Sequence, residues 1–235
     1  MLKIWEDLLT DEDKIVIESG NIRPRKPLGK NPLLLIIDCQ PNYIGADKPI
    51  TEQLDEWPSG GGLEAWDSVR RIIKVRNEAR KAGVPVFYTR NVQRQTLQFD
   101  SFSQKTNRDQ TKYMEGNPAT FLLPELGALD NELIISKAYP SAFYGTPLLS
   151  YLVKLGIDTI IIAGNSTSGC CRQTAADAVS MKFSLGYIED CITDRTGPSH
   201  KIGMLDMHLN YGNVITSDEV IDYLGKLSKG DDSCE

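Results

Sequence analysis

Asp38, Lys137 and Cys170 each follow a short apolar run of the sequence, and their side chains together are suited to nucleophilic chemistry. In an open parallel α/β sheet the ligand site lies beyond the carboxyl ends of the strands, so we expect the three side chains to meet there. A lysine near a cysteine favours the thiolate, which attacks carbonyl carbon. An aspartate within reach of the sulfur can take its proton and pass it to a leaving amine.

The segment around the cysteine has the composition of a tight junction between a strand and a helix. Residues 164–172 read Gly-Asn-Ser-Thr-Ser-Gly-Cys-Cys-Arg and separate a strand-like run, 159–163, from a helix-like run, 173–185. Cys170 therefore lies at a predicted helix N-terminus, where the partial positive charge of the helix favours an anion. The backbone N–H groups of residues 165–169 can point at the oxyanion that the attack creates.

Each of the three residues also has a purely structural explanation. A cysteine that follows a strand is most often a small buried hydrophobe. Asp38 can cap a helix or a turn, and Lys137 can lie on the surface after an edge strand. A disulfide between neighbours Cys170 and Cys171 would be strained. We assign three other cysteines to packing: Cys39, Cys171 and Cys191.

The elements around these residues alternate between strand and helix. Apolar runs predict six strands, at 33–37, 84–89, 132–136, 159–163, 187–192 and 213–216. Helical spacing and capping residues predict helices at 63–83, 146–156, 173–185 and 198–209, and a last helix that begins with a capping box at 216–219. This alternation is typical of one doubly wound α/β domain with a parallel sheet.

The two ends of the chain and one long connection stand apart from this pattern. Residues 1–30 are predicted to form a helical arm, with a helix at 5–19 started by Thr10 and ended by Gly20. The α/β domain then covers 31–228, and 229–235 is a frayed tail. The interval 90–131 has no long periodic segment, which is typical of a lid, a binding loop or an oligomer contact.

Composition excludes several classes of function. Hydrophobic residues make up 40% of the 235 and charged residues 25%, as in an ordinary globular protein, and the net charge of −6 argues against nucleic-acid binding. Without a signal peptide or an apolar run long enough to span a bilayer, we expect a cytoplasmic protein that binds no membrane. Five cysteines, an odd number, fit reduced thiols. The sequence contains no CxxC or HExxH motif, so neither a metal nor a cofactor is predicted.

Three stretches of sequence, taken in order, resemble the isochorismatase-like cysteine hydrolase superfamily. They are Leu-Ile-Ile-Asp-Cys-Gln at 35–40, Ile-Ile-Ser-Lys-Ala-Tyr-Pro-Ser-Ala-Phe-Tyr-Gly-Thr at 134–146, and Ala-Gly-Asn-Ser-Thr-Ser-Gly-Cys-Cys-Arg-Gln-Thr-Ala-Ala-Asp-Ala at 163–178. The resemblance covers roughly residues 30–225. Three motifs in the same order are far more specific than any one of them.

The resemblance implies a three-layer α/β/α fold and a catalytic triad of Asp38, Lys137 and Cys170 that works through a thioester acyl-enzyme. It also implies a cis peptide bond between Asn165 and Ser166. The backbone N–H groups of Ser166 and Cys170 would then form the oxyanion hole.

Further stretches look most like N-carbamoylsarcosine amidases and maleamate amidases: residues 166–172, the opening 5–14, and 190–200. By that likeness Arg195 binds the substrate carboxylate, for which a guanidinium offers two parallel hydrogen bonds, and Asn165 and Thr167 also contact substrate. The alternative is that Arg195 or Arg172 ties a loop to an acidic neighbour, which we favour for Arg172.

The expected function is hydrolysis of the C–N bond of a small carboxylate-bearing amide or ureido compound, with release of ammonia. Another small amide such as maleamate is an alternative substrate, and a non-catalytic binding protein is an alternative role. A phosphate-binding loop at 164–169 ranks last, because the Gly-Lys-Ser/Thr ending is missing.

Nicotinamidases of the superfamily have an Asp-x-His…His metal site, and the corresponding segment here contains no histidine. The resemblance also implies a homo-oligomer, a tetramer or dimer. The interval 90–131, with its aromatic residues Phe99, Phe102 and Tyr113, leaves the substrate open.

Overall fold

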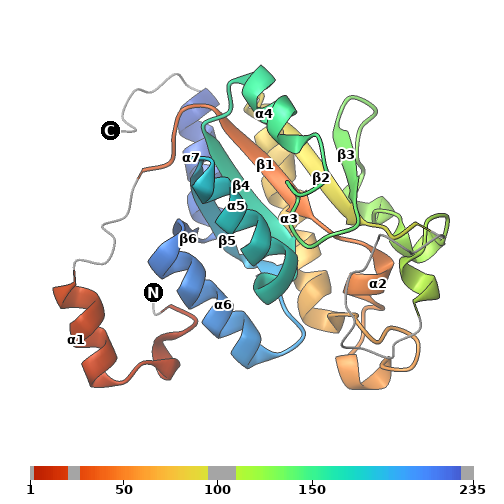
Figure 1. Cartoon of the computed structure of the whole chain (residues 1–235), viewed down its shortest axis with the longest axis horizontal. Helices are drawn as coiled ribbons and strands as arrows, with labels where there is room; N and C mark the ends of the chain where they lie inside the picture. The colour runs from red at the N-terminus through yellow and green to blue at the C-terminus, as the bar shows by residue number, and fades with distance from the viewer. Residues whose placement is uncertain (1–2, 21–26, 95–109, 229–235) are drawn as a thin grey trace.

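A six-stranded sheet forms the middle layer of the molecule (Figure 1). The computed structural model describes residues 3–20, 27–94 and 110–228. The strand order is β3-β2-β1-β4-β5-β6, and every neighbouring pair is parallel. The strands are β1 (Pro32–Ile37), β2 (Val86–Asn91), β3 (Leu133–Lys137), β4 (Thr159–Asn165), β5 (Ser184–Thr193) and β6 (Asn213–Ile215).

Helices cover both faces of this sheet, which confirms the predicted three-layer α/β/α fold. The helices α4 (Leu148–Leu155), α5 (Arg172–Ser180) and α6 (Gly197–Asn210) cover one face. The helices α3 (Gly62–Lys81) and α7 (Ser217–Ser228) cover the other. Strand β1 shows why its apolar run is continuous: Leu33 and Leu35 pack toward the first set of helices, and Leu34 and Ile36 toward the second. A strand buried on both faces needs apolar side chains at every position.

The order of the strands creates a switch point between β1 and β4. From β1 the chain winds outward to β2 and β3, and from β4 it winds the other way to β5 and β6. Connections therefore leave the carboxyl ends of β1 and β4 in opposite directions, and a crevice opens between them. Asp38 follows β1, and Cys170 lies just beyond β4.

Two predicted helices have different bounds in the structure. The helix expected at 173–185 is α5, which ends at Ser180; Lys182 adopts a positive φ of 73°, and β5 begins at Ser184. The helix expected at 5–19 is two pieces, the 3-10 turn η1 (Glu6–Leu8) and α1 (Asp11–Ser19). Leu9 and Thr10 are extended between them, and Thr10 and Asp13 form a capping box that starts α1.

The interval 90–131 continues β2 as far as Asn91, and its described part then contains short turns and an isolated parallel bridge between Gln93 and Met114. The turns are η3 (Thr111–Tyr113), η4 (Pro118–Thr120) and η5 (Pro124–Leu126). Three other short elements lie outside this interval: α2 (Pro41–Ile44), η2 (Ile50–Glu52) and η6 (Thr167–Cys171). Phe99 and Phe102 lie outside the described residues, as do residues 229–235. Among the residues described, no helix is both long and apolar enough to cross a membrane.

Candidate active site

Asp38, Lys137 and Cys170 meet at the carboxyl edge of the sheet. Lys137 lies at the end of the edge strand β3, and its side chain reaches across to the other two residues. Its Nζ lies 2.6 Å from Oδ2 of Asp38 and 3.3 Å from Sγ of Cys170. Asp38, Lys137 and Cys170 are 1%, 3% and 4% exposed respectively, which excludes the surface role considered for Lys137. The structure therefore brings together three residues that lie 99 and 33 positions apart in sequence.

The Lys137 ammonium has a complete set of acceptors in this site. Besides the carboxylate and the sulfur, it donates to the backbone carbonyl of Tyr139 at 3.2 Å. Burial by itself lowers the pKa of Lys137, but attraction to the Asp38 carboxylate and to Cys170 outweighs burial and raises that pKa above its ordinary value. Lys137 is therefore positively charged in the interior and compensates the buried charge of Asp38.

The Cys170 thiol is protonated at rest, which corrects one expectation from the sequence. Burial and the neighbouring Asp38 carboxylate raise the pKa of Cys170 to about 12. Lys137 acts in the expected direction and lowers this pKa, but its effect is the smaller one. A thiolate at this position therefore needs a group that accepts the proton, and the Asp38 carboxylate lies beside the thiol.

Asp38 is oriented by a residue that the sequence did not single out. Its Oδ1 accepts a hydrogen bond from Oγ1 of Thr89 at 2.7 Å, while Oδ2 binds Lys137. Asp38 also adopts a positive φ of 51°, which turns the chain sharply after β1. Thr89 lies opposite Ile37 in the parallel register of β1 and β2, so only the strand pairing reveals that its side chain reaches Asp38.

The loop that carries the cysteine begins with the expected cis peptide bond between Asn165 and Ser166. The π-helical turn η6 follows and leads directly into α5. Within it the carbonyl of Ser166 accepts hydrogen bonds from the N–H groups of Gly169 and Cys171, both at 3.1 Å. The backbone thus folds tightly around Cys170.

A cavity of about 190 Å³ opens over the sulfur of Cys170. Its walls come from four parts of the chain: the segment after β1, Pro140 after β3, the loop 165–171 that carries Cys170 (the nucleophile loop), and the end of β5. The lining residues are Tyr43, Ser59, Gly61, Pro140, Asn165, Ser166, Gly169, Cys170, Thr193, Asp194 and Arg195.

Two of the three residues expected to contact substrate line this cavity. Asn165 and Arg195 do, and the side-chain oxygen of Asn165 accepts a hydrogen bond from Thr193. Thr167 is fully buried instead, with Oγ1 2.6 Å from Nδ1 of His200, so the structure places its side chain behind the cavity wall. Burial lowers the pKa of His200, which keeps its imidazole neutral at neutral pH.

The two arginines differ as the sequence suggested. Arg172 pairs with Asp206 of α6, at 2.8 Å between Nη2 and Oδ2, which confirms the structural role favoured for it. Arg195 is exposed, and its guanidinium forms no ion pair within the part of the chain that the structure describes.

The wall opposite the nucleophile loop was missed from the sequence. Tyr43 and Ser59 lie in the turn-rich segment 41–62, and Ser59 Oγ lies 2.5 Å from the hydroxyl of Tyr113. Tyr113 in turn makes an edge-on contact with the ring of Tyr43. Their place in the sequence could have indicated this role, because the segment leaves the carboxyl end of β1 and must cross the crevice.

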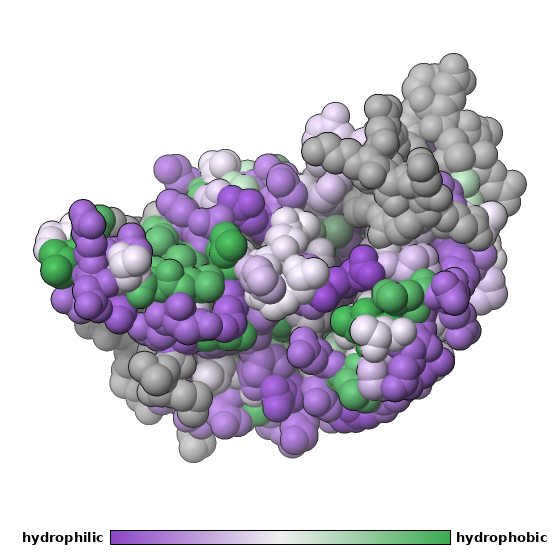
Figure 2. Space-filling model, turned by 90° about the horizontal axis from the view of Figure 1, so that it is seen from below, coloured by the Kyte–Doolittle hydropathy of each residue, from purple (hydrophilic) through white to green (hydrophobic). Residues whose placement is uncertain are grey.

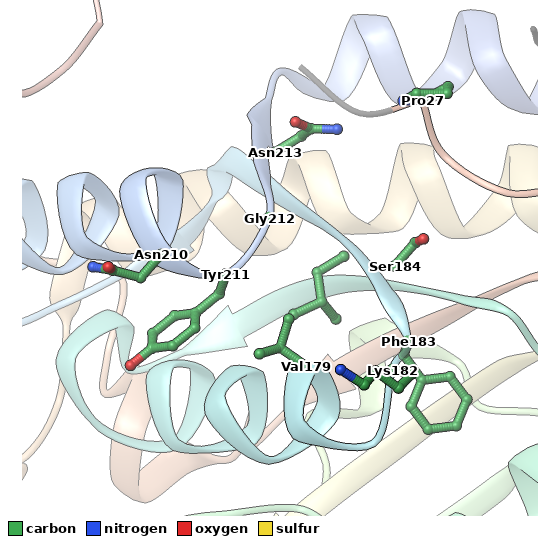
Figure 3. A pocket seen from close by; sticks show the side chains of 10 residues that line it. Pro27, Val179, Lys182, Phe183, Ser184, Asn210, Tyr211, Gly212 and Asn213 are labelled. Carbon is green, nitrogen blue, oxygen red and sulfur yellow. The ribbon is translucent and has the colours of Figure 1, made fainter. Parts of the chain in front are cut away.

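A second, larger cavity of about 300 Å³ lies at the opposite end of the strands, beside the amino ends of β5 and β6 (Figure 3). Side chains from the ends of α5 and α6, such as Val179 and Asn210, and from the starts of β5 and β6, Ser184 and Asn213, line it. The amino ends of parallel strands are remote from the triad, so the smaller cavity is the candidate active site. In the described ranges no group of three or more His, Cys, Asp and Glu side chains is arranged to hold a metal ion.

The fold and the site define an α/β protein with a buried cluster of aspartate, lysine and cysteine beneath a cavity at a sheet switch point. The sequence model of the isochorismatase domain matches residues 32–219, and the chain therefore belongs to the isochorismatase family, a family of hydrolases.

Relatives with named activities lie within this family. The chain is 29% identical over 202 residues to maleamate amidohydrolase from Pseudomonas putida, which covers 85% of this chain and 90% of that protein. It is 30% identical over 174 residues to N-carbamoylsarcosine amidase from Arthrobacter sp, covering 70% of this chain and 64% of that one. The structure of N-carbamoylsarcosine amidase from Thermoplasma acidophilum superposes with a TM-score of 0.65 at 26% identity, over 80% of this chain and 97% of that chain.

Proposed function

We propose that this protein is a cysteine-dependent amidohydrolase that cleaves the C–N bond of a small carboxylate-bearing amide or ureido compound. The observation that carries the proposal is the buried cluster of Asp38, Lys137 and Cys170 beneath a small cavity. The similarity to maleamate amidohydrolase and N-carbamoylsarcosine amidase supports the choice of substrate class.

In the first half of the proposed reaction, the Cys170 thiol transfers its proton to Asp38 while the sulfur attacks the carbonyl carbon. A C–S bond forms, and the carbonyl π electrons move to oxygen. The backbone N–H groups of Ser166 and Cys170 would bind this oxyanion. Lys137 stabilises the sulfur anion as the proton leaves, because its Nζ lies 3.3 Å from that atom.

The second half returns the site to its starting state. As the oxyanion collapses, the C–N bond breaks, and the nitrogen takes the proton from Asp38 and leaves as ammonia. Asp38, again a carboxylate, then removes a proton from water, whose oxygen attacks the thioester. Breaking the C–S bond releases the acid, and the proton returns to Cys170.

Arg195 is assigned the carboxylate of the substrate in this proposal. It lies in the cavity wall, is exposed, and is not engaged by an acidic side chain among the described residues. A cavity of about 190 Å³ lies below the range of about 300–1,000 Å³ typical of sites for drug-sized ligands, which favours a substrate of few atoms. N-carbamoylsarcosine and maleamate are such compounds.

Replacing Cys170 tests the proposal directly. We expect Cys170→Ala and Cys170→Ser to abolish release of ammonia from N-carbamoylsarcosine and maleamate while circular dichroism and the melting temperature stay close to wild type. Cys191→Ala is the matched control, because Cys191 is also buried but packs in the core on the other face of the sheet. Unchanged turnover in the Cys170 variants would refute the mechanism, whereas a wild-type protein that hydrolyses none of these amides would favour a non-catalytic binding role.

A further inference from the structure

The cavity wall contains two neighbouring side chains of opposite charge that do not pair with each other. Asp194 and Arg195 follow β5 and both line the cavity. Oδ2 of Asp194 accepts two hydrogen bonds from Ser168, from the backbone N–H at 2.8 Å and from Oγ at 2.6 Å. Oδ1 accepts from the backbone N–H of Arg195 at 2.8 Å. The carboxylate is therefore satisfied without the Arg195 guanidinium.

We infer that Ser168 is a specificity-determining residue that keeps Arg195 available for the substrate. It acts as a positioning residue, because its hydroxyl holds the Asp194 carboxylate on the nucleophile loop and away from the neighbouring guanidinium. The inference rests on the proposed function, in which Arg195 binds a substrate carboxylate.

The physical reason is competition between two carboxylates for one guanidinium. A bidentate pair is the preferred arrangement of arginine with a carboxylate, whether that group belongs to a ligand or to the protein. An adjacent, mobile Asp194 side chain would occupy Arg195 and also repel an incoming anion. Two charge-assisted hydrogen bonds from Ser168 remove both effects, since they fix the carboxylate and spread its charge onto the loop.

A second contact fixes the same segment beyond Arg195. Thr167, the residue before Ser168, binds His200 through its hydroxyl at 2.6 Å. Residues 194–200 are thus attached to the nucleophile loop on both sides of Arg195, by Ser168 to Asp194 and by Thr167 to His200. These two hydroxyls therefore hold the segment from which the Arg195 side chain extends.

The experiment compares two substrates that differ in charge: maleamate and maleamide, in which a neutral carboxamide replaces the carboxylate. In Ser168→Ala the hydroxyl bond is lost and the N–H bond stays. We expect KM for maleamate to rise about threefold to fivefold, the strength of an exposed ion pair, with kcat for maleamate and kcat/KM for maleamide unchanged. Ser168→Thr keeps the hydroxyl and should restore the wild-type KM.

Two further variants complete the test. Adding Asp194→Asn to Ser168→Ala should bring KM for maleamate back toward wild type, because the competing charge is gone. Ser180→Ala, which removes an exposed hydroxyl that donates to the Ala176 carbonyl on α5, is the matched control and should change nothing.

The possible outcomes separate the inference from the proposed function. If the wild type hydrolyses these amides but Ser168→Ala leaves KM for maleamate unchanged, or lowers kcat for both substrates equally, the inference is overturned and the proposed function stands. If the wild type hydrolyses neither these amides nor N-carbamoylsarcosine, the proposed substrate class fails and the inference fails with it.

Discussion

The proton on Cys170 determines when the site can react. Burial and the Asp38 carboxylate raise the pKa of the thiol to about 12, so the free protein holds a thiol and not a thiolate at neutral pH. A buried thiolate beside a carboxylate would repel it, whereas a thiol can give its proton to that carboxylate during the attack. In the proposed mechanism the nucleophile is therefore generated together with the acid that later protonates the leaving amine.

This protonation state predicts how Cys170 responds to pH. A raised pKa means that the thiolate fraction keeps growing with pH, about tenfold for each unit between pH 7 and 10, because this range lies below the pKa. We expect the rate of iodoacetamide labelling at Cys170, followed by mass spectrometry of its peptide, to rise over that range without levelling off. A rate that is already constant at pH 7 would show a resting thiolate.

The meeting of Asp38, Lys137 and Cys170 could be predicted from sequence because each lies at or shortly after the end of a strand, and the strands are visible as apolar runs. Thr89 and Ser59 could not be predicted in the same way. Thr89 reaches Asp38 only through the pairing of β1 with β2, and Ser59 enters the cavity wall through its contact with Tyr113, 54 residues away. Contacts of this kind depend on register and loop path, which a single sequence does not encode in any local pattern.

Among the elements, the end of β4 is the most tightly constrained. Gly164 has a φ of 114°, and a Cβ placed on it would lie 2.0 Å from the carbonyl oxygen of Ile37 in β1. The close approach brings the turn after β4 next to the turn after β1, and so Cys170 next to Asp38. A side chain at this position would force the two strands apart.

Gly164→Ala tests this constraint. We expect it to lower the free energy of unfolding by about 3 kcal/mol or more, since both the φ angle and the contact with β1 are incompatible with a Cβ. Gly225→Ala is the control, because Gly225 lies in α7 with open space around it and should gain about 0.5–1 kcal/mol. Urea unfolding measures both, and a Gly164→Ala protein as stable as wild type would contradict the assignment.

The elements themselves were largely predictable, and their bounds less so. All six strands appear where the apolar runs lie, and the capping box predicted at 216–219 is present, with Glu219 Oε2 accepting from Thr216 N–H and Thr216 Oγ1 accepting from Glu219 N–H. The end of α5 was wrong because Phe183 and Leu185 continue the apolar pattern past the turn at Lys182. Hydrophobicity alone does not show where a helix gives way to a strand.

At the scale of the whole molecule, the surface is mainly hydrophilic with separate hydrophobic patches (Figure 2). The helix α1, at the left of Figure 1, contributes two exposed apolar side chains, Ile15 and Val16, which are 62% and 56% exposed. The helix α1 buries none of its own residues within the described structure. A nine-residue helix is marginal without tertiary contacts, so a partner surface would stabilise it.

The prediction at this scale concerns the number of subunits, which the sequence resemblance implies to be more than one. We expect a tetramer or dimer by light scattering coupled to size-exclusion chromatography, because an oligomer would cover apolar surface that one chain leaves exposed. A mass of one chain, 26.2 kDa, at micromolar concentration would contradict it.

The predicted cytoplasmic location and the domain limits at residues 30 and 228 stay predictions.

The burial of Trp5 shows that the hydrophobic core extends beyond the residues that match the family. Trp5 is 3% exposed and lies against the ring of His208 on α6, while Lys3 donates to the carbonyl of Val214 in β6. At the other end α7 contributes Val220 and Leu224 to the second core. A fragment trimmed to the family match at 32–219 would therefore lose core side chains at both ends. We therefore expect the folding unit to begin before Trp5 and to extend through α7.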